Sequence, residues 1–125
     1  MKLSNLFVLN AIVALLFGLG FVLMPEQVVD LYDVTLDDAG IYIANIFGAA
    51  LLGFATMSWI ARNSGASDAR KGLMWGLFVE HVVGFVFSLM AQTAGLMNAM
   101  GWSIVAIYGI LALGYAYFLF MAPSD

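Results

Sequence analysis

The fold is decided by the stretch from Gly72 to Ala91 (72–91), GLMWGLFVEHVVGFVFSLMA, because nearly all of its residues are apolar. A helix that crosses the hydrocarbon layer of a membrane needs about 20 such residues. Three further stretches meet this requirement, at about 3–24, 39–61 and 100–121. The sequence therefore predicts one all-α domain over residues 1–125, an integral membrane four-helix bundle. Its short connections favour antiparallel neighbours in an up-and-down order.

The amino-acid composition agrees with this fold class. Hydrophobic residues make up 64% of the chain and charged residues 10%, and the mean hydropathy is +1.01. Soluble domains have about 45–50% apolar and about 25% charged residues. Four Lys and Arg residues without a basic run argue against nucleic-acid binding. The sequence has no cysteine, so a disulfide framework and a thiolate metal site are excluded.

The positively charged residues predict the orientation of the bundle. All of them lie at the N-terminus or in the second connection: Lys2, Arg62, Arg70 and Lys71. Loops that carry Lys and Arg stay in the cytoplasm, and amphipathic rings prefer the membrane interface. Such rings lie near the same ends of the spans, at Trp59, Trp75, Tyr115 and Tyr117. We therefore expect a multi-pass protein of the bacterial inner (plasma) membrane with both N- and C-termini in the cytoplasm.

Small residues within the spans predict where the helices pack. Lipid is as apolar as the helices, so helix association depends on close approach at small residues and on a few polar contacts. Residues four positions apart lie near one another on one face of a helix. The predicted packing positions are Gly72, Gly76, Gly84 and Ser88 in the third span and Gly48 and Gly53 in the second.

Glu80 and His81 form the candidate site, because both lie near the middle of a membrane-spanning segment. Their depth is ~13 Å in a hydrocarbon layer of ~30 Å. Ionisable groups at that depth are costly and mark functional sites by default. Neighbouring residues on a helix point ~100° apart, so a direct pair between these two side chains is not expected. Candidate partners are Asn10, Asn45 (through water) and Tyr108.

Two roles for Glu80 and His81 remain open. The functional role is proton exchange or cation binding inside the bundle. The structural role is to link helices through hydrogen bonds of a protonated Glu80 and a neutral His81, because burial favours the neutral forms. Haem or pigment binding through His81 is a minor alternative, since imidazole is a common axial ligand. No catalytic residue, metal site or cofactor is assigned, because the sequence contains none of the established catalytic or metal-binding motifs.

Glycine-rich apolar stretches carry a resemblance to known proteins. They are Phe17 to Phe21, Pro25, Leu31-Tyr32, Ile46 to Gly53 and Gly109 to Phe118. These stretches resemble a broad set of uncharacterised small bacterial four-span inner-membrane proteins, loosely similar to the DoxX-like group. The resemblance implies a four-helix membrane bundle and supplies no substrate.

The expected function is that of a non-enzymatic membrane protein. Its small size, short loops and small-residue faces favour an accessory or assembly subunit of a larger membrane complex. The alternative is a small proton- or cation-coupled transporter that uses Glu80 and His81. In size and in its membrane-embedded Glu the chain resembles small multidrug transporters, although their key Glu lies on the first helix. The expected partners are the lipid bilayer and either a larger membrane complex or a second copy in a homodimer.

Overall fold

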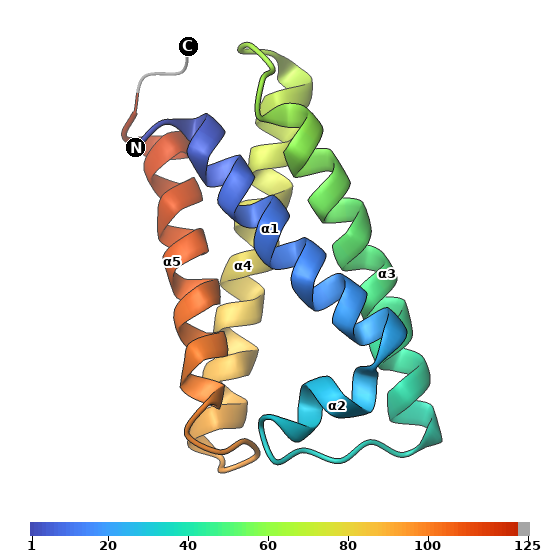
Figure 1. Ribbon diagram of the computed structural model, residues 1–125. Helices are drawn as coiled ribbons and strands as arrows, with labels where there is room; N and C mark the ends of the chain where they lie inside the picture. The colour runs from blue at the N-terminus through green and yellow to red at the C-terminus, as the bar shows by residue number, and fades with distance from the viewer. Residues whose placement is uncertain (123–125) are drawn as a thin grey trace.

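Four long helices and one short helix make up the fold (Figure 1). In chain order they are α1 (Leu3–Leu23), α2 (Pro25–Asp30), α3 (Asp38–Ala61), α4 (Asp68–Thr93) and α5 (Gly101–Phe120). The computed structural model describes residues 1–122, and no strand occurs among them. All four long helices are long and apolar enough to cross a membrane. The predicted all-α fold with four long apolar helices in a bundle is therefore confirmed.

Side-chain caps set the beginning of two long helices. The Asp37 carboxylate accepts a hydrogen bond from the Gly40 amide at 2.7 Å, and the Ser67 hydroxyl accepts one from the Arg70 amide at 3.1 Å. Such caps satisfy amide groups that have no partner within the helix. The helix α4 is longer at both ends than the predicted span 72–91, because the polar residues on either side of the apolar stretch continue the helix.

The short helix α2 follows α1 almost without a connection. Pro25 has no N–H group, and its ring prevents the preceding helix from continuing, so it begins the new helix α2. The chain turns sharply at this point. In Figure 1, α2 lies across the lower end of the bundle, between the ends of the long helices.

The four long helices form two antiparallel pairs. α1 packs along α3, and α4 packs along α5. Figure 1 shows α1 crossing between the pairs, near α5 at the end that carries the N-terminus and near α3 at the other end. We call these the terminal end and the α2 end. The pairs therefore converge at the terminal end and diverge toward the α2 end.

The close approach of α1 and α3 depends on small and polar residues. A Cβ atom on Gly48 would lie only 2.9 Å from the carbonyl oxygen of Gly18. The Asn45 amide donates a hydrogen bond to the Phe21 carbonyl oxygen at 2.9 Å. Such contacts are the means by which apolar helices associate in lipid.

The other predicted packing positions have different surroundings. A Cβ atom on Gly84 would overlap the ring of Tyr108, so α4 and α5 need glycine there. Ser88 is buried and donates to the Phe85 carbonyl oxygen of its own helix at 3.1 Å. No atom lies within 4 Å of a Cβ atom placed on Gly53, Gly72 or Gly76. For these three glycines, the prediction of a close helix contact within the chain is wrong, because they face outward.

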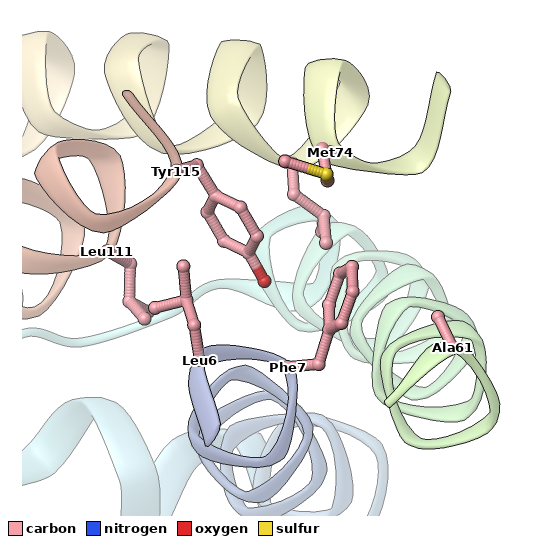
Figure 2. Packing of buried hydrophobic residues seen from close by; sticks show 7 residues of the cluster. Leu6, Phe7, Ala61, Met74, Leu111 and Tyr115 are labelled. Atoms are coloured by element: carbon pink, nitrogen blue, oxygen red, sulfur yellow. The ribbon is translucent and has the colours of Figure 1, made fainter. Parts of the chain in front are cut away.

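A hydrophobic cluster joins all four long helices at the terminal end (Figure 2). Its members are Leu6, Phe7, Ala61, Met74, Leu77, Leu111 and Tyr115. A second cluster, of Ala14, Leu51 and Ala55, joins only α1 and α3. The clusters therefore hold the bundle together at one end and leave space between the helix pairs nearer the α2 end.

Candidate functional site

A cavity of about 260 Å³ lies between the two helix pairs. Every helix or its adjoining connection contributes to the wall, and most of the wall is apolar. The apolar lining from α1, α3 and α5 consists of Val13, Ala14, Phe17, Phe21, Phe47, Leu51, Phe54, Ile104 and Ile107. Ligand sites in proteins are typically apolar cavities with a few well-placed polar groups.

The α2 end of the cavity is covered by the first and third connections. Tyr32 from the first and Met97 from the third line the cavity. Asn98 ties the two connections together, because its backbone amide donates to the Tyr32 carbonyl oxygen at 3.0 Å. Its side-chain amide donates to the Leu31 carbonyl oxygen, also at 3.0 Å. We call Pro25 to Val34 together with Asn98 the α2 cover.

Four of the five predicted site residues reach this cavity. They are Asn10 from α1, Glu80 and His81 from α4, and Tyr108 from α5. Asn45 does not line it, because its side chain is directed to the backbone of α1. The tertiary structure thus brings together residues from three helices that are far apart in the sequence.

Asn10 has a partner that the sequence did not suggest. Its side-chain amide donates to the hydroxyl of Ser58 on α3 at 2.8 Å, and both residues are buried. Burying an amide without a partner is costly, so this bond allows Asn10 to lie on an apolar wall. Asn10 contributes a neutral polar group to the cavity.

Glu80 and His81 pair directly. His81 Nδ1 lies 2.8 Å from Glu80 Oε2 and 2.6 Å from the carbonyl oxygen of Leu77. The prediction that their directions on the helix would keep them apart is wrong. The Glu80 side chain has enough rotatable bonds to turn back to the neighbouring ring. His81 is almost fully buried, whereas 23% of the Glu80 side chain stays exposed.

Two tyrosines of α5 enclose the imidazole of His81. The ring centroids of Tyr108 and Tyr115 each lie 5.8 Å from that of His81. Tyr115 was expected at the membrane interface but is 0% exposed. Its hydroxyl has no hydrogen-bond partner among the described residues. Sequence reasoning missed Tyr115 because a tyrosine near the end of a span usually marks the interface.

The chemistry available at this site is that of one carboxylate and one imidazole. No Lys or Arg from the described part of the chain lines the cavity. Among residues 1–122, no group of three His, Cys, Asp or Glu side chains could hold a metal ion. Because Nδ1 of His81 already faces two oxygen atoms, only Nε2 is left to bind a haem or another ligand. The pair can hold one proton between its two groups, or exchange it for another positive charge.

Comparisons with known proteins identify a family but no activity. Neither a curated protein nor a solved structure matches the chain. A family model described as "Domain of unknown function (DUF8292)" matches residues 8–94, which include Asn10, Glu80 and His81 but not Tyr108. This match does not support the resemblance to the DoxX-like group. Because it covers most of the chain, the protein belongs to the DUF8292 family.

Proposed function

We propose that this protein is a small membrane transporter that couples the passage of a small molecule to protonation of Glu80 and His81. The observation that carries the proposal is the position of this pair on the wall of the cavity between two helix pairs. An ionisable residue that faces the interior of a membrane bundle is characteristic of ion and substrate pathways.

The bonding of the pair favours this role over a structural one. A structural pair would join one helix to another. Here Nδ1 of His81 faces Glu80 and Leu77, which both belong to α4. A charged residue at the centre of a spanning helix costs about 2.5–3.5 kcal/mol on insertion scales. Bonds within α4 do not hold this helix against another one, so they do not offset the cost through helix association. A functional reason for Glu80 is therefore favoured.

The construction of the bundle also suits a transporter. The hydrophobic cluster lies at the terminal end of the cavity, and the α2 cover lies at the other end. Between the pairs, the closest helix packing is that of α1 against α5. In transporters, alternating access arises when one rigid group of helices rocks against another around a central site. The two helix pairs are the natural rigid groups.

The distribution of charged residues supports the orientation that we propose for the transporter. The positively charged residues lie at the helix ends that meet at the terminal end: Lys2 at the beginning of α1, Arg62 at the end of α3, and Arg70 and Lys71 in the first turn of α4. The segment around α2, at the other end, carries Glu26, Asp30 and Asp33. By the positive-inside rule, the terminal end faces the cytoplasm and the α2 cover faces outward in a bacterial inner membrane.

A role as an accessory subunit is the second candidate. Gly72 and Gly76 on α4 are exposed, and the space beside them is open. Small residues four positions apart allow close approach of another membrane helix. This observation favours a contact with a partner protein or with a second copy, and it is compatible with transport by a homodimer.

Proton flux in reconstituted vesicles tests the proposal. Vesicles would enclose a pH-sensitive dye and receive trimethylphenylammonium, benzenesulfonate or 2-phenylethanol under an imposed pH gradient. We expect at least one probe to accelerate proton flux with the wild-type protein but not with Glu80→Gln. Asp68→Asn is the matched control, because it removes an exposed carboxylate at the terminal end, outside both the cavity and the α2 cover. The proposal fails if no probe raises flux above that of protein-free vesicles, or if Glu80→Gln behaves like the wild type.

A further inference from the structure

We infer that the cavity binds a small lipophilic organic cation, such as a protonated amine, in exchange for the proton held by Glu80 and His81. This inference rests on the proposed function and names its substrate class. It follows from the charge, the aromatic lining and the size of the cavity.

The charge of the wall excludes one class of ligand and favours another. Among residues 1–122, Glu80 is the only carboxylate on the wall, and no Lys or Arg lies beside it. A protonated His81 is already paired with Glu80 at 2.8 Å, so an anion would have no cation of its own on the wall and would lie near a carboxylate in a medium of low dielectric constant. The other groups that face the pair are uncharged: Asn10 from α1 and Tyr108 and Tyr115 from α5. A cationic ligand is the one that Glu80 attracts.

Aromatic rings line the remainder of the cavity. Six of them contribute to the wall: Phe17, Phe21, Tyr32, Phe47, Phe54 and Tyr108. Phe21 and Phe47, from α1 and α3, lie with their centroids 5.4 Å apart. Ring faces attract organic cations, and rings also bury the apolar part of such a ligand. The lining therefore fits both halves of a lipophilic cation.

The exchange keeps the charge of the site constant. In the proposed exchange, the pair holds one proton before the ligand binds, so that a carboxylate and an imidazolium lie 2.8 Å apart and carry no net charge. When an ammonium group binds, the Glu80 carboxylate turns to it, and the imidazolium of His81 releases one proton and becomes neutral. Charge balances because one cation enters and one proton leaves. Neither before nor after the exchange does the site contain a buried charge without a partner of opposite sign.

His81 keeps its orientation during this exchange. The carbonyl oxygen of Leu77 lies 2.6 Å from Nδ1, so a neutral imidazole with a proton on Nδ1 still donates to it. A second hydrogen bond of this kind is the usual means by which proteins fix the tautomer of a functional histidine. The ring is therefore ready to accept a proton again when the cation leaves.

The volume of the cavity limits the ligand to a small molecule. The cavity of about 260 Å³ lies near the lower end of the range of about 300–1,000 Å³ that is usual for ligand pockets. A compact molecule with a single aromatic ring suits a cavity of this size. Phenylethyl compounds have this size, and their terminal group can be changed without changing the skeleton.

Isothermal titration calorimetry of the purified full chain in mild detergent tests this inference. The probes are 2-phenylethylamine, 2-phenylethanol and phenylacetate, which differ in charge at one end. We expect the amine to bind at least about tenfold more tightly than the alcohol, as Glu80 and the ring faces attract only the cation. Phenylacetate should not bind. Repeating the titration in buffers of different ionisation enthalpy should show one proton released for each amine bound.

Two variants assign the selectivity to the carboxylate. Glu80→Gln should bind the amine no more tightly than the alcohol, whereas its affinity for the alcohol stays unchanged. Glu80→Asp keeps the charge and should keep the preference for the amine. A loss of this preference in Glu80→Gln alone can then be assigned to the missing charge and not to a loss of fold. Circular dichroism checks that both variants keep their helices.

The outcomes separate this inference from the proposed function. Equal affinity for the amine and the alcohol, tighter binding of phenylacetate, or amine binding without proton release overturns the inference. Amine binding with proton release but without flux in vesicles overturns the transport proposal and supports the ligand class. Flux driven by 2-phenylethanol or benzenesulfonate, but not by trimethylphenylammonium, supports transport and overturns the ligand class.

Discussion

Gly76 and Gly84 belong to the same stripe of α4 but have opposite surroundings. A Cβ atom on Gly84 would overlap the Tyr108 ring, whereas the space around Gly76 is open for 4 Å. Only Gly84 therefore allows α4 and α5 to approach closely. Substitution of Gly84 therefore tests the contact between α4 and α5, whereas substitution of Gly76 tests only the effect of glycine on the stability of α4.

Alanine at these two positions gives a direct test. Gly84→Ala should lower the free energy of unfolding by about 1–3 kcal/mol, because the added methyl group displaces the Tyr108 ring. Gly76→Ala should leave it unchanged or raise it by up to ~1 kcal/mol, because alanine favours the helix. Unfolding in sodium dodecyl sulfate, followed by circular dichroism, measures both. Similar effects at the two sites would contradict the packing described for α4 and α5.

Among the helices, α2 has a role that differs from that of the long ones. It is too short to cross a membrane and covers the end of the cavity. Asn98 of the third connection binds the segment that follows α2. Its side-chain amide donates to the Leu31 carbonyl oxygen, and its backbone amide donates to the Tyr32 carbonyl oxygen. We therefore interpret the α2 cover as the element that controls access to the cavity from this end.

Removing the side chain of Asn98 should loosen the α2 cover. Asn98→Ala loses two side-chain bonds, the one donated to the Leu31 carbonyl oxygen and the one accepted from the Met100 amide, and keeps the backbone bond to Tyr32. The cover should therefore open more often without unfolding of the bundle. Hydrogen exchange of the amides in residues 25–34 should become several-fold faster, in line with a lost bond of about 1 kcal/mol. Asn63→Ala, in the exposed turn at the terminal end, is the control and should leave this exchange unchanged. Unchanged protection in Asn98→Ala would show that other contacts hold the cover.

At the scale of the whole molecule, the two ends of the bundle are held together differently. The hydrophobic cluster joins α1, α3, α4 and α5 at the terminal end. At the α2 end, the helix pairs diverge around the cavity. A ligand that binds between the pairs should therefore change the spacing at the α2 end and leave the terminal end nearly unchanged.

Spin-label distances can measure this difference, because the chain contains no cysteine that would be labelled as well. One pair of labels would be Tyr42→Cys and Trp102→Cys, on exposed positions of α3 and α5 near the α2 end. The other pair would be Ile60→Cys and Tyr117→Cys near the terminal end. Addition of 2-phenylethylamine should shift or narrow the distance distribution of the first pair only. If the ligand changed the distance distributions of both label pairs equally, the prediction that only the α2 end changes its spacing would be wrong.

Much of the fold could be predicted because it depends on summed hydrophobicity. Transfer of about 20 apolar residues into the bilayer is favourable whatever their order, so composition along the chain determined the four long helices. The same reasoning identified Glu80 and His81 as unusual, because the cost of an ionisable group in lipid does not depend on its neighbours. These conclusions required no knowledge of helix contacts.

The arrangement of the helices was decided by the tertiary structure. Lipid and protein interior are equally apolar, so the pattern of residues does not reveal which face of a membrane helix is buried. For this reason the sequence did not determine the pairing of α1 with α3, the burial of Tyr115 or the outward position of Gly76. The sequence by itself determined that Glu80 and His81 lie within a helix that is long and apolar enough to cross a membrane. Only the packing of two helix pairs around a cavity decided what these side chains face.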